Sequence, residues 1–215
     1  AGTTQVTITV NPAAVAAVGA ATRATCSGTP LTLGAAAVTG STYSWSPAVG
    51  LSSTTVANPT ATLTTTASIT TSQMYTLTVT STATGCTGTA SVTVTVNPLP
   101  VVVPGPAVTI CSGGSATLGG PAVAGLTYSW SPATGLSSAT VANPTVTLTN
   151  YTGAPITQPY TLTATNTATG CSGTATVVVT VNPAVVVVPG TNVAICSGGT
   201  AQLGGPAVAG LTYSW

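Results

Sequence analysis

A repeat of about 85 residues is the feature that most restricts how this sequence can fold. Whole phrases recur at that offset, since Thr-Tyr-Ser-Trp-Ser-Pro-Ala at residues 42–48 returns at 127–133. Single landmark residues recur with them: Cys26, Cys111 and Cys196; Trp45, Trp130 and Trp215; Cys86 and Cys171; Tyr75 and Tyr160. Self-similarity at a fixed period indicates copies of one structural unit stacked along the chain.

The phase of the repeat divides the chain into four parts. Residues 1–12 match the closing strand of a repeat, because their alternation is that of Val92–Val96. Residues 13–98 and 99–183 each hold one whole repeat, and residues 184–215 hold the first strands of a further, incomplete one. Natural proteins seldom stop at a core Trp, so we expect a segment of a longer array.

Within a repeat the apolar residues recur with a period of two. Tyr75 to Val79 and Val92 to Val96 alternate strictly with Thr, which predicts strands with one buried face. Turn residues fall between such runs about every 8–12 residues, as expected for a β-sandwich. In the second repeat the predicted strands are residues 101–103 with 107–110, 115–118, 127–131, 145–149, 160–165 and 174–181. The predicted fold class is all-β, with tandem immunoglobulin-like sandwiches.

Five aromatic residues stand inside these strands and are predicted to form the cores: Trp45, Trp130, Trp215, Tyr75 and Tyr160. The alternative is an aromatic platform that binds a sugar. Burial of Trp45 and Trp130 would favour the core, and coplanar exposed rings would favour the platform.

The near absence of charge excludes most chemistry. The sequence has no Asp, Glu or His, and its one charged side chain is Arg23. Acid–base catalysis needs a group that titrates near the working pH, and calcium prefers carboxylates. Nucleic-acid binding needs several Lys or Arg side chains. We therefore expect neither an enzyme nor a nucleic-acid-binding protein, and no cofactor and no metal. We also expect no membrane span in this sequence, because a span needs roughly 20 mostly apolar residues and the longest candidate, Ala13 to Ala21, is short.

The motifs of the second repeat resemble a known family. Tyr-Ser-Trp-Ser-Pro-Ala-Thr-Gly-Leu-Ser-Ser at 128–138 is followed by Ala-Asn-Pro-Thr at 142–145, Tyr-Thr-Leu-Thr at 160–163 and Gly-Cys at 170–171. This pattern is similar to the PKD-like and Ig-like repeats of large secreted surface proteins of Bacteroidota. The resemblance implies type IX secretion and a role in stalks of adhesins, gliding-motility proteins or secreted enzymes. Those repeats commonly carry Asp or Asn before the Gly-Cys, where Thr82–Thr84 and Thr167–Thr169 stand here.

Export favours disulfides over zinc, since the chain has no His and no Cys-x-x-Cys. The first expectation pairs Cys26 with Cys86 and Cys111 with Cys171, and leaves Cys196 to pair with a residue outside this sequence. The alternative joins neighbouring repeats, Cys86 with Cys111 and Cys171 with Cys196. An objection to the first is that the two cysteines of one sandwich could lie at opposite ends.

The sequence thus predicts a structural extracellular protein on the cell surface, a segment of a long fibre or adhesin stalk. Charge normally keeps proteins apart, so its absence favours self-association into filaments. O-glycosylation of Thr and Ser, or charged domains elsewhere in a longer protein, would also account for the composition. The alternative function is a non-catalytic module that binds a carbohydrate, such as a surface polysaccharide.

Overall fold

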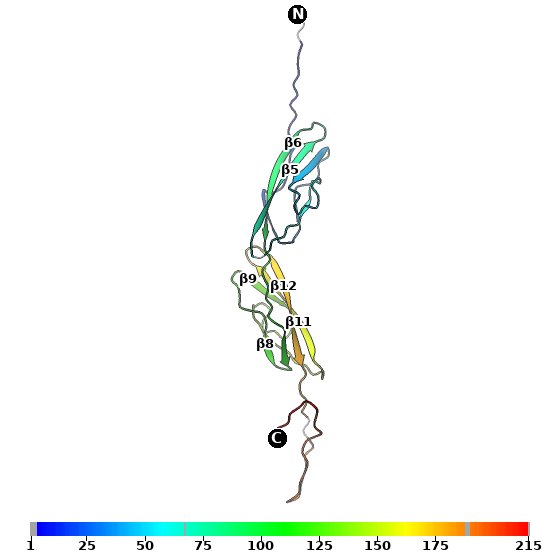
Figure 1. Ribbon diagram of the computed structural model, residues 1–215, viewed down its shortest axis with the longest axis vertical. Coiled ribbons are helices and arrows are strands. Elements are labelled where there is room, and N and C mark those ends of the chain that lie inside the picture. The colour runs from blue at the N-terminus through cyan, green and yellow to red at the C-terminus, as the bar shows by residue number, and fades with distance from the viewer. Residues whose placement is uncertain (1–3, 67, 188–189, 215) are drawn as a thin grey trace.

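Two β-sandwiches follow one another along the chain in the computed structural model, which describes residues 4–66, 68–187 and 190–214 (Figure 1). In the first, the larger sheet has the order β1 (Thr22–Cys26), β6 (Thr87–Asn97), β5 (Thr71–Ser81) and β3 (Ser41–Ser46). Facing it is the pair β2 (Leu31–Thr32) and β4 (Thr60–Ala61).

The second sandwich repeats this arrangement. Its larger sheet has the order β7 (Val108–Cys111), β12 (Ser172–Asn182), β11 (Ile156–Asn166) and β9 (Leu126–Ser131). Facing it is the pair β10 (Thr145–Thr147) and β8 (Ser115–Thr117). The described residues contain no helix, and therefore none that could cross a bilayer. The all-β, immunoglobulin-like sandwich expected from the sequence is confirmed.

In each sandwich the first strand runs parallel to the last. The C-terminal ends of these two strands therefore lie together at one end of the sandwich. β1 pairs with β6 so that Cys26 stands opposite Asn97, and β7 pairs with β12 so that Cys111 stands opposite Asn182. The last strand also forms a long antiparallel hairpin with the strand before it, β5 with β6 and β11 with β12. The hairpin turn therefore lies at the opposite end of the sandwich from the first cysteine.

The period-two pattern places the core. Along β6, Val92, Val94 and Val96 are fully buried while the Thr residues between them are half-exposed. Trp45 is 3 % exposed, and its indole Nε1 donates a hydrogen bond to the Val56 carbonyl at 3.0 Å. Trp130 is equally buried and donates to the Val141 carbonyl at 2.9 Å. Burial with the polar N–H satisfied is the usual condition of a core indole.

Glycine at one position is required by the packing of this indole. Gly34 has a φ of +73°, and a Cβ there would overlap the carbonyl of Ala57 and approach Trp45 Cζ2 to 3.0 Å. Gly119 meets the equivalent atoms in the second sandwich. A residue without Cβ lets the loop that carries Ala57 lie directly against the Trp ring.

The two core tyrosines each join the sheet to a loop. The Tyr75 hydroxyl donates to the Val49 carbonyl at 2.5 Å, and the Tyr160 hydroxyl donates to the Thr134 carbonyl at 2.6 Å. Both rings are fully buried. Desolvation by burial raises the pKa of both phenols above the ordinary value near 10.

Asn150 is the buried polar side chain of the described residues. Its Nδ2 donates to the carbonyls of Ala154 and Val181, both at 2.7 Å. Its Oδ1 accepts from the backbone N–H and the hydroxyl of Thr152. The amide thus holds a loop against β12, and its nitrogen is inaccessible to a glycosyl group although residues 150–152 match an N-glycosylation sequon.

The strands expected in the second repeat agree with β8 to β12 within a few residues. Residues 101–103 differ, because they form no strand, although Val102 packs against the core. Residues 4–17 and the described residues from 184 to 214 also contain no strand. The latter still keep the turns of a repeat, since Gly199 N donates to Cys196 O as Gly114 N donates to Cys111 O. Trp215 lies outside the described residues.

Candidate functional site at the junction of the sandwiches

The described residues offer no constellation for catalysis or metal binding. They contain no group of three or more His, Cys, Asp or Glu side chains that could hold a metal ion. Arg23 is engaged with the backbone, because its Nη1 donates to the Thr32 carbonyl at 2.6 Å. A pocket of the second sandwich is lined by apolar side chains such as Val102 and Leu162, with the Tyr128 ring beside them. The reactive groups that remain are the cysteines.

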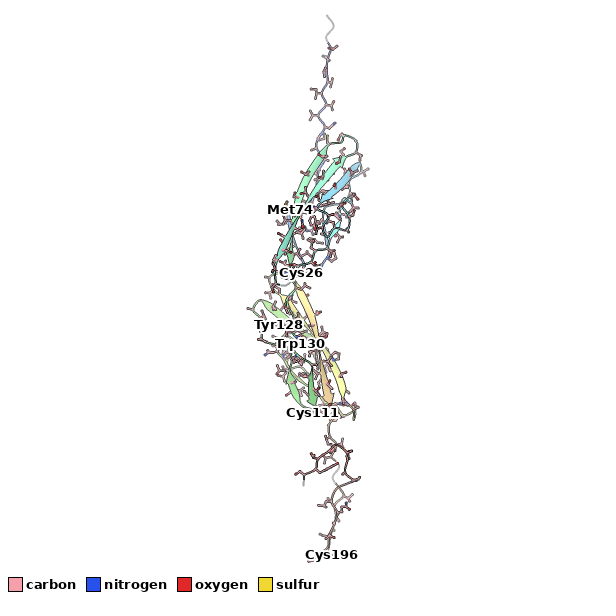
Figure 2. All side chains as sticks on the ribbon, in the orientation of Figure 1. Cys26, Met74, Cys111, Tyr128, Trp130 and Cys196 are labelled. Atoms are coloured by element: carbon pink, nitrogen blue, oxygen red, sulfur yellow. A yellow bond between two sulfur atoms is a disulfide. The ribbon has the colours of Figure 1, made fainter. Side chains whose placement is uncertain are left out.

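A disulfide between Cys26 and Cys171 joins the two sandwiches, with Cα atoms 5.6 Å apart. Cys26 ends β1 at the lower end of the first sandwich, and Figure 2 places it at the junction of the two. Cys171 stands in the turn of the β11–β12 hairpin, immediately before β12. The parallel pairing of β1 with β6 brings the first cysteine down to the junction. The long hairpin brings the second cysteine up to it.

Local hydrogen bonds fix both halves of this junction. In the hairpin turn, Asn166 Oδ1 accepts from the N–H groups of Ala168 and Thr169. Gly170 N donates to the Asn166 carbonyl, which closes the turn. On the other side, Ser27 N donates to the Asn97 carbonyl at 2.8 Å, which extends the β1–β6 ladder past Cys26. Cys171 is 1 % exposed, so the bond is shielded from solvent on that side.

The linker passes close to the second sandwich. It consists of Asn97-Pro98-Leu99-Pro100, where the prolines restrict the backbone. A Cβ at Gly173 would stand 2.6 Å from the Pro100 carbonyl, so glycine there lets the linker lie against the start of β12. The chain meets the first sandwich in the same way, because a Cβ at Gly88 would overlap the carbonyl of Ala14.

The observed bond corrects both pairings expected from the sequence. Cys26 bonds Cys171 rather than Cys86, and Cys86, Cys111 and Cys196 carry free thiols. Cys26 and Cys86 lie at opposite ends of one sandwich, separated by the 11 residues of β6. At about 3.3 Å per residue this is over 30 Å, whereas a disulfide needs Cα atoms within about 7 Å. Cys111 and Cys171 likewise lie at opposite ends of the second sandwich, so they cannot form a disulfide. Cys86 and Cys111 are further apart still, because they lie at the outer ends of the two sandwiches. Figure 2 shows Cys196 far from the junction that holds Cys171.

The sequence contained a signal for the observed pairing. Cys26 follows the first predicted strand of its repeat, while Cys171 precedes the last strand of the next. In a sandwich whose first and last strands are parallel, these two positions face each other across a short linker. The signal was missed because sequence alone does not say that the first strand pairs in parallel with the last.

Comparisons with known proteins do not assign this chain to a family. No model of a known protein family matches the sequence, and no curated protein matches it. Among solved structures, an endo-fucoidan hydrolase of glycoside hydrolase family 107 is 15% identical, with a TM-score of 0.29. The match covers 60% of this chain and 21% of that one, so this chain corresponds to only a small part of that protein.

Other solved structures are similar at the same level. Sidekick-1 immunoglobulin domains 1–5 are 12% identical over 78% of this chain and 39% of that one, with a TM-score of 0.33. Three titin immunoglobulin domains are 12% identical over 77% and 64%, also at 0.33. A SusE-like surface located polysaccharide binding protein from Bacteroides thetaiotaomicron is 11% identical over 74% and 32%, at 0.38. At these scores the fold assignment rests on the strands, register and cores of this chain.

Proposed function

We propose that this chain is an extracellular structural spacer, built from immunoglobulin-like domains that disulfides hold end to end. The observation that carries the proposal is the bond between Cys26 and Cys171, which ties two consecutive domains at the ends where they meet. Disulfides persist in oxidising compartments, which supports a location outside the cell. A spacer has to keep its ends apart, and a second covalent tie beside a proline-containing linker restricts bending between the domains.

The domain boundaries proposed for this spacer follow the repeat. Residues 13–98 and 99–183 form whole repeats, and residues 1–12 and 184–215 belong to neighbouring repeats of the same kind. The turn at residues 196–199 supports this division, since it has the hydrogen bond of the turn at 111–114. The PKD-like type and the surface-protein setting of Bacteroidota, with type IX secretion, remain part of the proposal through the motif resemblance alone.

Self-association into filaments is the finer part of the proposal. The formal net charge of the whole chain is +1, so electrostatic repulsion between copies is weak. A carbohydrate-binding module has less support, because the indoles of Trp45 and Trp130 are 3 % exposed and cannot present a flat face to a sugar.

Small-angle X-ray scattering tests the spacer. The reference variant carries serine at Cys86, Cys111 and Cys196, so that Cys26–Cys171 is its one disulfide. The test variant carries serine at Cys26 and Cys171 as well. We expect the reference to keep one narrow distribution of interatomic distances and the test variant to populate bent forms with a broader distribution. Identical distributions would show that the bond does not restrict bending between the domains. Circular dichroism checks that both variants fold.

A further inference from the structure

Each sandwich has an entry end, where the chain arrives, and an exit end, where the chain leaves for the next repeat. The last strands β6 and β12 finish at the exit ends, at Asn97 and Asn182, and a proline follows each. The arriving chain lies against the start of the same strand, where Gly88 and Gly173 leave room for its backbone. The hairpin turn before the last strand therefore stands at the entry end.

Cys111 has, at the exit end of the second sandwich, the backbone surroundings of Cys26 in the first. Each cysteine stands opposite the asparagine that ends the last strand. The next N–H donates to the carbonyl of that asparagine, at 2.8 Å in the first sandwich and 2.9 Å in the second. The N–H after it donates to a leucine carbonyl at 2.8 Å in both. Cys111 is exposed and lies at the far end of the second sandwich (Figure 2), so its thiol faces away from the observed junction.

Cys86 has, at the entry end of the first sandwich, the surroundings of Cys171 in the second. Both hairpin turns are closed by the N–H of the glycine before the cysteine, which donates to a carbonyl four residues earlier at 2.8 Å. Both cysteine N–H groups donate to a Thr hydroxyl at 3.3 Å. The Cys86 Sγ lies 3.9 Å from the carbonyl oxygen of Asn11, the repeat equivalent of Asn97. Because Cys26 stands opposite Asn97, the Cys86 thiol faces the place of a first-strand cysteine in the preceding repeat.

We infer that the junction disulfide recurs along the array, and that the first-strand cysteine of each repeat bonds the hairpin cysteine of the next. Cys111 then bonds the hairpin cysteine of the repeat that follows residues 99–183. Cys86 bonds the first-strand cysteine of the repeat that precedes residues 13–98. The two cysteines of one repeat serve different neighbours and never bond each other. The inference deepens the proposed function, on which it rests, by naming the partner of each thiol.

The covalent step needs an oxidant, and a small disulfide such as oxidised glutathione supplies it. The two cysteine thiols lose two protons and two electrons as their sulfur–sulfur bond forms. The disulfide of oxidised glutathione is reduced to two thiols in exchange.

A chain with one more repeat tests the partner of Cys111. A second copy of residues 99–183 is inserted after Pro183 of the whole chain, so that Leu99 of the copy follows Pro183 as Leu99 follows Pro98. Every cysteine is serine except Cys111 of the original repeat and Cys171 of the inserted copy. The matched control keeps Cys111 and Cys171 of the original repeat instead. After oxidation with glutathione, alkylation and intact mass spectrometry count the remaining thiols. We expect at least about tenfold more oxidised monomer in the first chain, because the ends of one sandwich are too far apart for a disulfide.

The same design tests the partner of Cys86. A second copy of residues 13–98 is inserted after Pro98, so that Ala13 of the copy follows Pro98 as Ala13 follows Pro12. Cys26 of the original repeat and Cys86 of the inserted copy are then the only cysteines, and we expect an oxidised monomer. The matched control keeps Cys26 and Cys86 of the original repeat, and it should remain reduced.

The 215-residue chain that keeps Cys26 and Cys171 alone is the positive control, and circular dichroism checks that every chain folds. Pairs between repeats that stay reduced while the positive control oxidises would overturn the inference. Equal oxidation of the pairs within one repeat, or bonds found only between separate chains, would overturn it too. The scattering experiment depends on Cys26–Cys171 alone, so the spacer proposal can stand when this inference fails.

Discussion

Removal of the Cys26–Cys171 bond should destabilise each sandwich although it removes no core contact. The perturbation is the double substitution Cys26→Ser and Cys171→Ser, in a background where Cys86, Cys111 and Cys196 are also serine. Every buried apolar side chain of each core comes from its own sandwich, so both domains keep their native packing. The effect should arise from the unfolded chain, which the bond restricts.

The structure gives the size of that restriction. When the second sandwich unfolds and the first stays folded, Cys26 remains fixed opposite Asn97. The unfolded loop then runs from Asn97 to Cys171, a difference of 74 positions. A loop of that length corresponds to about 4.5 kcal/mol in the chain-entropy treatment. This is an upper limit, because the folded pair also gains freedom to bend when the bond is absent.

Urea denaturation followed by circular dichroism measures the effect. With a slope of about 2 kcal/mol per molar urea, a loss of about 4 kcal/mol lowers the midpoint by about 2 M. An unchanged slope would show that the native and unfolded surfaces are otherwise the same. A midpoint shift below about 0.3 M, with native spectra in both proteins, would refute the reasoning, because the loop would then carry no constraint.

The remaining predictions concern the cores and the response to pH. Tyr75→Phe should cost about 1 kcal/mol, since a buried carbonyl loses its donor, and Tyr160→Phe should cost about as much; urea midpoints measure both. Burial raises the pKa of these phenols in the folded state, so stability should be complete below the unfolded value near pH 10 and should fall as the pH rises beyond it toward the folded pKa. With thiols alkylated, stability should be nearly constant between about pH 4 and 9, because the sequence has no Asp, Glu or His, and a decline in that range would contradict this account. Gly34→Ala should lower the free energy of unfolding by more than about 2 kcal/mol, because the added Cβ would overlap a carbonyl oxygen. Gly28→Ala, at a φ of +77° with open space around the added Cβ, should lower it by only about 1 kcal/mol. Thermal unfolding measures both.

Strict alternation made the long strands predictable. Tyr75 to Val79 and Val92 to Val96 have one apolar and one Thr-rich face, and that pattern is compatible with few structures other than a half-buried sheet. The short strands β2 and β4 were harder to recognise, since two residues are too few to show a period. Residues 101–103 are apolar and β-branched, yet they run beside the sheet without joining a ladder, which depends on where the linker directs them.

The disulfide could not be predicted from spacing, because pairing depends on which ends of the strands meet. Cys26 and Cys171 are 145 positions apart, and the bond forms only because β1 is parallel to β6 and the β11–β12 turn faces the first sandwich. Loop length alone would favour the nearer Cys86. Strand direction is a property of tertiary structure, and the composition of a five-residue strand does not encode it.

The Cys26–Cys171 bond also determines how far the molecule can be stretched. Residue 14 lies at the upper end of the first sandwich beside Gly88, and Cys26 lies at its lower end. From Cys171 the chain runs straight along β12 to Asn182 at the far end of the second sandwich. The shortest covalent route from residue 13 to residue 183 therefore consists of residues 13–26, the sulfur–sulfur bond and residues 171–183.

That route contains 27 residues, 14 on one side of the bond and 13 on the other. At about 3.5 Å per residue its contour length is about 95 Å, whereas the 171 residues of the same stretch without the bond would extend to about 600 Å. A pulling force applied across both sandwiches would load this short route first. Even complete unfolding of the domains would release almost no slack, so the pair behaves under tension as a tether of nearly fixed length.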